Sequence, residues 1–113
     1  MADSDKQTIL IVEDQVMNRE LLKTILMDEY ETIEAGDGQT ALELLNEQDN
    51  HIIAVLLDLM MPVMDGYEFL QRIRGSGFDS LPIIVMTGET DQKSELRALQ
   101  LGAWDFISQP YQP

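Results

Sequence analysis

The chain has 113 residues, of which 44% are hydrophobic, so it is long enough for one packed domain and too apolar for a disordered segment. Its 21 acidic residues outnumber 7 basic ones and give a formal net charge of −14, which disfavours direct binding to nucleic acid. Cysteine is absent, which excludes disulfides and thiolate metal sites, and no apolar stretch approaches the roughly 20 residues of a membrane span.

The N-terminal residues 1–7 are polar and lack the apolar core of a secretory signal. We therefore expect a polar tail at 1–7, a single domain over residues 8–113 and a cytoplasmic location. The domain shows no internal repeat, low-complexity tract or linker.

Short apolar segments alternate with segments of helical periodicity along the domain. The predicted strands are residues 8–12, 31–35, 52–57, 82–86 and 104–107. Between them, apolar side chains recur at helical spacing, as in Met17, Leu21 and Ile25. This alternation predicts right-handed βαβ units and an α/β fold with a mainly parallel, doubly wound sheet.

The apolar content of the strands predicts their order. Continuously apolar strands belong in the middle of such a sheet, whereas the more polar strand at 31–35 belongs at an edge. For a doubly wound sheet of this size we expect the order 2-1-3-4-5. That order places the carboxyl ends of strands one and three side by side.

Carboxylates follow both of these strands. Glu13 and Asp14 come after the first strand and Asp58 comes after the third. Two carboxylates about 4 Å apart repel by roughly 4 kcal/mol at an effective dielectric of about 20, so the cluster needs a cation. Oxygen ligands without Cys or His favour Mg²⁺, or Mn²⁺ in its place. The alternative is that Glu13 and Asp14 only cap the first helix, where negative charge is favourable.

The fourth strand ends beside the same cleft, at Thr87 and Gly88. A threonine hydroxyl can hydrogen-bond a phosphoryl oxygen, and the glycine leaves room for a bulky group. An ordinary turn at the end of a strand is the alternative interpretation of this pair.

Taken together, these motifs resemble the receiver domain of two-component response regulators, with a likeness to chemotaxis regulators. The resemblance covers residues 9–110 and rests above all on the run from Leu57 to Gly66. The other matching positions are Glu13-Asp14, Asn18-Arg19, Glu34-Ala35-Gly36-Asp37-Gly38, Thr87-Gly88 and Leu101-Gly102-Ala103. The resemblance implies a flavodoxin-like five-stranded fold.

The resemblance also implies roles for the acidic cluster. Asp58 would accept a phosphoryl group from a histidine kinase and form an acyl phosphate. Asp14 and Asp58 would bind Mg²⁺ together with the backbone carbonyl of Met60, while Glu13 would act mainly through water. The chain would then be a phospho-accepting regulatory domain rather than an enzyme, acting on itself only in phosphorylation and dephosphorylation.

A second group of residues would read out the phosphorylation. By resemblance, Thr87 would bond the phosphoryl group and shift inward, and Phe106 would be the aromatic switch that follows it. The receiver pattern ends its fifth strand with Lys-Pro, but this chain has Gln109-Pro110. Glutamine can donate a hydrogen bond but carries no charge, so we expect weakened or rewired coupling between Asp58 and the switch.

Two alternative functions follow from particular residues. The first is a degenerate receiver that serves as a protein-interaction module without phosphorylation, and Gln109 motivates it. The second is a Mg²⁺-dependent phosphatase of the haloacid dehalogenase type, which also uses an aspartyl nucleophile. That class expects a second Asp two residues after the first, where this chain has Met60.

Expected partners follow from the receiver interpretation. They are a sensor histidine kinase or phosphotransfer protein, and an output domain or target protein outside this chain. Only Tyr111, Gln112 and Pro113 follow Pro110, so the final helix of the fold is expected to be missing. A bare face on strands four and five would favour a homodimer. No nucleic-acid or membrane partner is expected.

Overall fold

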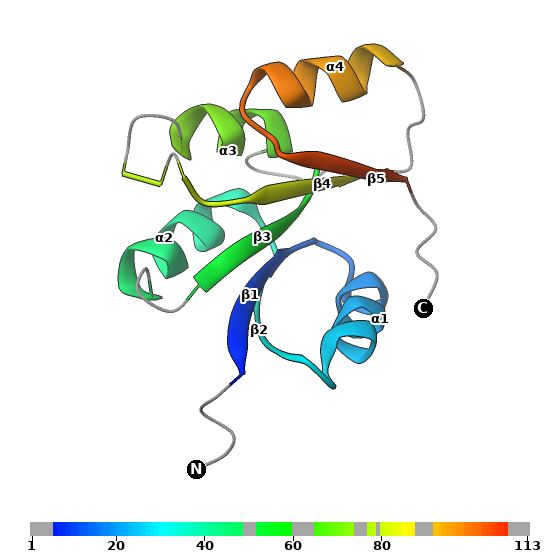
Figure 1. The fold of residues 1–113 in the computed structure, drawn as a ribbon, viewed down its shortest axis with the longest axis vertical. Helices are drawn as coiled ribbons and strands as arrows, with labels where there is room; N and C mark the ends of the chain where they lie inside the picture. Colours follow the sequence, from blue (N-terminus) through cyan, green and yellow to red (C-terminus); the bar gives the residue numbers. More distant parts are fainter. Residues whose placement is uncertain are drawn as a thin grey trace.

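The computed structural model describes residues 6–48, 52–59, 65–73, 77–78, 80–87 and 92–108, in which strands and helices alternate (Figure 1). The strands in these ranges are β1 (Gln7–Val12), β2 (Tyr30–Ala35), β3 (Ile52–Asp58), β4 (Ile83–Thr87) and β5 (Asp105–Ser108). The helices are α1 (Val16–Leu26), α2 (Gly38–Gln48), α3 (Gly66–Ile73) and α4 (Gln92–Gln100).

The strands form one parallel sheet in the order β2-β1-β3-β4-β5, which confirms the predicted fold class and strand order. The continuously apolar β1 and β3 pair at its centre, and residues 9–12 and 55–58 are buried. The more polar β2 is an edge strand and only Ala35 in it is fully buried. The continuously apolar strands thus lie at the centre of the sheet, and the more polar strand lies at its edge.

The observed bounds differ slightly from the predicted ones. β3 extends to Asp58, because the ladder with β4 continues to the pair Asp58 and Met86. β1 begins at Gln7, paired with Tyr30 of β2. The predicted absence of a final helix concerns positions after 108, which lie outside the described residues.

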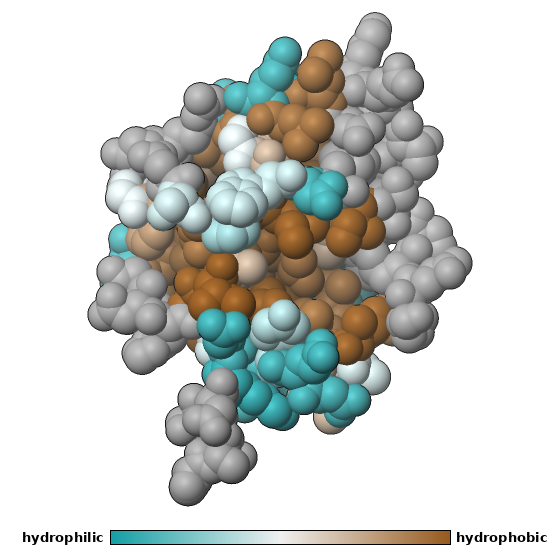
Figure 2. All heavy atoms as spheres, in the orientation of Figure 1, coloured by the Kyte–Doolittle hydropathy of each residue, from teal (hydrophilic) through white to brown (hydrophobic). Residues whose placement is uncertain are grey.

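Helices cover the two faces of the sheet unequally. Figure 1 shows α1 on one side, and α2, α3 and α4 on the other. The larger apolar core lies under these three helices, and the smaller core under α1 is centred on Ile11, Leu22 and Met86. At the β4–β5 end of the α1 face, Ile84 is half-buried and Ile107 is 44% exposed. Figure 2 shows apolar surface over the region of the strands.

Aspartate and glycine mark the ends of three helices. The backbone N–H of Thr40 donates to Asp37 Oδ1 (2.8 Å) at the start of α2, and that of Glu68 donates to Asp65 Oδ1 (2.9 Å) at the start of α3. Both aspartates satisfy N–H groups that have no partner within the helix. Gly102 follows α4 with a φ of 110°, a conformation that favours glycine.

The described helices are short. The longest, α1 and α2, have 11 residues each, and none is long and apolar enough to cross a bilayer.

Candidate phosphoacceptor and metal site

Three carboxylates meet at the carboxyl edge of the sheet. Val12 of β1 pairs with Leu57 of β3, so the residues that follow them come out of the sheet at the same level. One carboxylate oxygen from each of Glu13, Asp14 and Asp58 lies within 4.8 Å of the others. The predicted convergence of these side chains is therefore present in the fold.

The cluster is withdrawn from solvent to different degrees. Glu13 is fully buried, Asp58 is 5% exposed and Asp14 is half-buried. The pKa of Glu13 is raised from 4.5 to about 7. Burial is the largest cause, the Asp58 charge and hydrogen bonds to both aspartates add to the rise, and the bond from the Gln15 N–H opposes it. A cation placed among these oxygens would remove the cost of keeping all three ionised.

The backbone and side chain of Glu13 are both held in place. Its N–H donates to the carbonyl of Ala35 in β2 (3.0 Å), and its carbonyl accepts a bond from Arg19 Nη1 (2.8 Å). Its carboxylate Oε2 accepts the backbone N–H of Gln15 (3.1 Å). These bonds fix the turn between β1 and α1 in one conformation.

Neither Glu13 nor Asp14 occupies the N-cap position of α1. Gln15 occupies that position without a capping bond from its side chain, and α1 has no acidic residue in its first turn. Glu13 bonds the N–H of Gln15 itself, one residue before the helix begins. The two acids lie in the cluster with Asp58, and Glu13 also accepts a bond from the residue at the start of the helix.

Asp58 is positioned by the close approach of α3 to the end of β3. The Gly66 N–H donates to the carbonyl of Leu59 (3.0 Å), and the Leu59 N–H donates to the carbonyl of Met86 (3.2 Å). A Cβ atom on Gly66 would lie 2.7 Å from Leu59 Cα and 2.8 Å from the Asp58 carbonyl oxygen. Only glycine therefore fits at this crossing without displacing the backbone that carries Asp58.

The donor set fits a hard divalent cation. Carboxylate oxygens from two neighbouring strands converge, two of the three side chains are almost completely buried, and the described residues contain no cysteine or histidine beside them. Such oxygen-only sets suit Mg²⁺ or Mn²⁺.

Comparison with known proteins identifies the family of this chain. The model of the family described as the response regulator receiver domain matches residues 9–113. The chain belongs to this family. Its relatives include the ycf27 protein of Cyanophora paradoxa, 38% identical over 96% of this chain and 44% of that protein. The sensor histidine kinase RcsC of Escherichia coli is 40% identical over 97% of this chain and 11% of that protein.

Solved receiver structures share the fold. The chemotaxis protein CheY4 of Vibrio cholerae superimposes with a TM-score of 0.88 and is 29% identical over 96% of this chain and 90% of that one. The receiver domain described here spans less than half the length of ycf27 and a small part of RcsC. Receiver domains are regulatory phosphoacceptors rather than turnover enzymes in general.

The remaining predicted site residues are described only in part or not at all. The backbone of Thr87 ends β4, one residue beyond the partner of Asp58, and the backbone of Phe106 pairs with Val85. The side chains of Thr87 and Phe106 lie outside the described part of the receiver domain, as do the whole of Met60 and Gln109.

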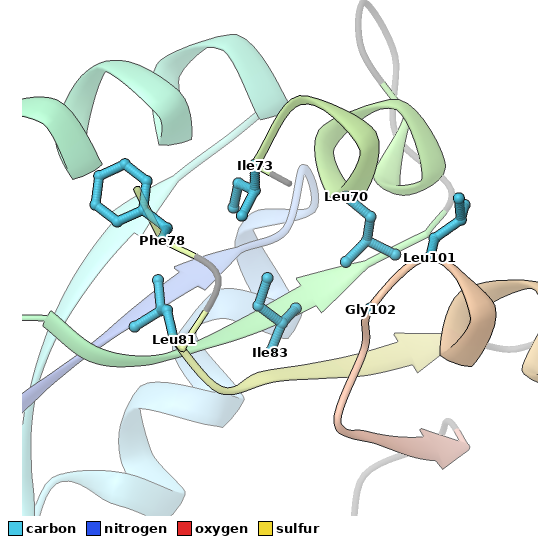
Figure 3. A pocket seen from close by; sticks show the side chains of 7 residues that line it. All are labelled: Leu70, Ile73, Phe78, Leu81, Ile83, Leu101 and Gly102. Atoms are coloured by element: carbon cyan, nitrogen blue, oxygen red, sulfur yellow. The ribbon is translucent and has the colours of Figure 1, made fainter. Parts of the chain in front are cut away.

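A separate apolar cavity of about 260 Å³ lies away from the acidic cluster. Figure 3 shows side chains from α3 and from the segments beside β4 and α4 around it. Ile83, which begins β4, contributes to its wall, so the cavity lies toward the amino end of that strand. The described lining of this cavity contains no titratable side chain. The lining residues are Leu70, Ile73, Phe78, Leu81, Ile83, Leu101 and Gly102.

Proposed function

We propose that this receiver domain is a phospho-accepting signalling switch in a two-component phosphorelay, with Asp58 as the acceptor and Mg²⁺ as the cofactor. The observation that supports this most directly is the convergence of Asp58 with Glu13 and Asp14 within 4.8 Å. Asp58 ends a central strand, is 5% exposed and lies beside the two acids, so a metal and an incoming phosphoryl group can meet at one carboxylate.

The transfer step needs positioning and charge neutralisation more than covalent chemistry from the protein. One carboxylate oxygen of Asp58 attacks phosphorus, the phosphorus–nitrogen bond of a donor phosphohistidine breaks, and the imidazole leaves with the bonding electron pair. Bound Mg²⁺ would neutralise charge on the phosphoryl oxygens. The product is an acyl phosphate on Asp58, which adds about −1.5 to −2 of charge to the site.

The three acids would contact the metal in different ways. Asp14 and Asp58 would bind it directly with the carbonyl of Met60, and the fully buried Glu13 would act mainly through water. Glu13 is anchored by its bond from the Gln15 N–H, so it can orient a water ligand without moving.

The readout is proposed to run through Thr87 and Phe106, with Gln109 in place of a lysine. The donor is a sensor histidine kinase or phosphotransfer protein, and the recipient of the signal is an output domain or target protein. A cytoplasmic location follows from this role.

The test is incubation with Mg²⁺ and acetyl phosphate, followed by intact-protein mass spectrometry. We expect one phosphoryl group per chain in the wild type and none in Asp58→Asn, because the amide cannot form the acyl phosphate. Asp28→Asn is the matched control: Asp28 is an exposed acid in the turn after α1, and its replacement should leave the adduct unchanged.

Other outcomes of this experiment separate the alternative functions. A folded wild type that forms no adduct with Mg²⁺ would favour the phosphorylation-independent interaction module suggested by Gln109. Repeated hydrolysis of phosphate esters would favour a phosphatase. An adduct that persists in Asp58→Asn would contradict the assignment of the acceptor.

A further inference from the structure

Arg19 connects three segments around the acidic cluster. It lies on α1, and its Nη1 donates to the carbonyl oxygen of Glu13 at 2.8 Å. Its Nε donates to Glu34 Oε1 on β2 at 3.3 Å. The Arg19 side chain is 20% exposed and that of Glu34 is 27% exposed, so both are largely shielded from water.

The bond to the Glu13 carbonyl bears on Asp14 through covalent geometry. That carbonyl belongs to the peptide unit between Glu13 and Asp14, and peptide units are planar. The bond from Arg19 to the carbonyl oxygen therefore fixes the orientation of the whole peptide unit. The backbone of Asp14 continues from this unit, so its direction is fixed as well. A guanidinium is well suited to this task, because its charge strengthens the bond and its rigid fork reaches two partners at once.

Glu34 keeps the guanidinium in place. Its Oε1 accepts from Arg19, while its Oε2 lies 3.9 Å from Lys23 Nζ. Lys23 is 52% exposed and forms an ion pair with Glu34, and no contact found among the described residues joins its side chain to the turn after β1. Arg19 and Lys23 therefore both pair with Glu34, and Arg19 also contacts the backbone of Glu13.

We propose that Arg19 is a positioning residue for the metal ligands Glu13 and Asp14, with Glu34 as its anchor. This inference rests on the proposed function, since it assigns the geometry of the same metal site. Removal of a residue that orients metal ligands typically lowers the metal affinity about 10- to 100-fold.

The direction of the effect distinguishes positioning from simple charge. Removing a positive charge near a cation site should strengthen Mg²⁺ binding, because one repulsive charge is lost. Loss of positioning should weaken it. We therefore expect Arg19→Ala to bind Mg²⁺ about tenfold more weakly than the wild type, although the loss of its charge alone would strengthen binding.

The experiment is calorimetric titration of Mg²⁺ alone into the wild type, Arg19→Ala, Arg19→Lys and the matched control Lys23→Ala. Arg19→Lys should recover part of the affinity, since an ammonium can reach one of the two partners but not both in the same geometry. Lys23→Ala removes a charge from the same glutamate without touching the turn, and should bind like the wild type. Thermal unfolding in EDTA confirms that each variant is folded at the titration temperature.

The single variant Glu34→Gln should also weaken Mg²⁺ binding, and it tests the proposal if Arg19→Ala does not fold. Where both single variants fold, a double-mutant cycle tests the anchor. If Glu34 acts through Arg19, the double variant should bind Mg²⁺ no more weakly than Arg19→Ala alone. Additive losses would contradict the role of Glu34 as the anchor.

Two negative results have different meanings. A wild type that binds no Mg²⁺ overturns the proposed metal-dependent function and this inference with it. Suppose instead that the wild type binds Mg²⁺, that Asp58→Asn does not, and that folded Arg19→Ala binds with the wild-type affinity. This result overturns only the positioning role.

Discussion

Glu13 is a carboxylic acid withdrawn from water. It is fully buried between two aspartates, and burial raises its pKa from 4.5 to about 7. In the absence of metal, the folded receiver domain therefore binds a proton more tightly than the unfolded chain does. Protonated Glu13 stabilises the fold, and ionised Glu13 opposes it.

The first consequence is a pH dependence of metal-free stability. Between pH 4.5 and 7 the native state holds the proton on Glu13 while the unfolded state has released it, so stability from this group falls as the pH rises. The loss is complete above about pH 7 and amounts to at most roughly 3 kcal/mol. Denaturant unfolding in EDTA across this range measures it.

Glu13→Gln provides the comparison, because glutamine is neutral at every pH. Its stability should exceed that of the wild type at pH 7.5, and the difference should shrink toward pH 4.5. Glu20→Gln, which changes an exposed acid on α1, should follow the wild-type profile. Parallel curves for wild type and Glu13→Gln would contradict the raised pKa.

Single residues also show where sequence reasoning succeeds and where it stops. Glu13, Asp14 and Asp58 could be predicted to converge, because strand order alone brings the ends of β1 and β3 together. The contacts of Arg19 could not, because helical spacing does not say which way a long side chain turns. Those contacts depend on the packing of α1 against β2.

The start of α3 lies in close contact with the end of the strand that carries Asp58. Gly66 lies where a Cβ would approach Leu59 Cα to 2.7 Å, well inside any real contact distance. The obstacle is backbone rather than a flexible side chain, so a larger residue must push α3 away from β3. The position of Asp58 depends on that contact.

Gly66→Ala should therefore destabilise the receiver domain by about 1–3 kcal/mol and lower its yield of phosphorylated Asp58. Denaturant unfolding and the acetyl phosphate assay measure the two effects. Gly36→Ala is the matched control, because a Cβ there would meet Arg19 Nη1 at 3.5 Å, an ordinary contact. Equal stability of the Gly66→Ala and Gly36→Ala proteins would show that α3 can move away from β3 without loss of stability, and would contradict the prediction.

Element bounds were predictable to within a residue or so where turn chemistry marks them. Asp37 and Asp65 start helices and Gly102 follows one, as expected from the preferences of Asp and Gly. The extension of β3 through Asp58 was not predictable, because it depends on its pairing with Met86 in another strand.

Across the whole molecule, the two faces of the sheet differ in how well they are covered. Three helices cover one face, while α1 alone covers the other within the described residues, where Ile107 is 44% exposed at the β5 edge. Burial of such surface favours association of two copies. The net charge of −14 opposes it, since like-charged copies repel.

These opposing forces predict association that increases with salt. Raising ionic strength screens the repulsion between copies and leaves apolar contact largely intact. Sedimentation equilibrium should show a larger dimer fraction at 0.5 M than at about 0.05 M NaCl, where the screening length is longer. Ile107→Lys should reduce the dimer fraction at both concentrations. A monomer that is unaffected by salt would contradict the prediction.

The acidic cluster has one further consequence, which concerns folding. Its carboxylates come from strands that are distant in sequence and adjacent only after β1 and β3 have paired, so the unfolded chain offers no such site. A cation that binds there binds the native state alone and stabilises it in proportion to the logarithm of its free concentration. On the proposed function, the magnesium that prepares the receiver domain for signalling would also determine how much of it is folded.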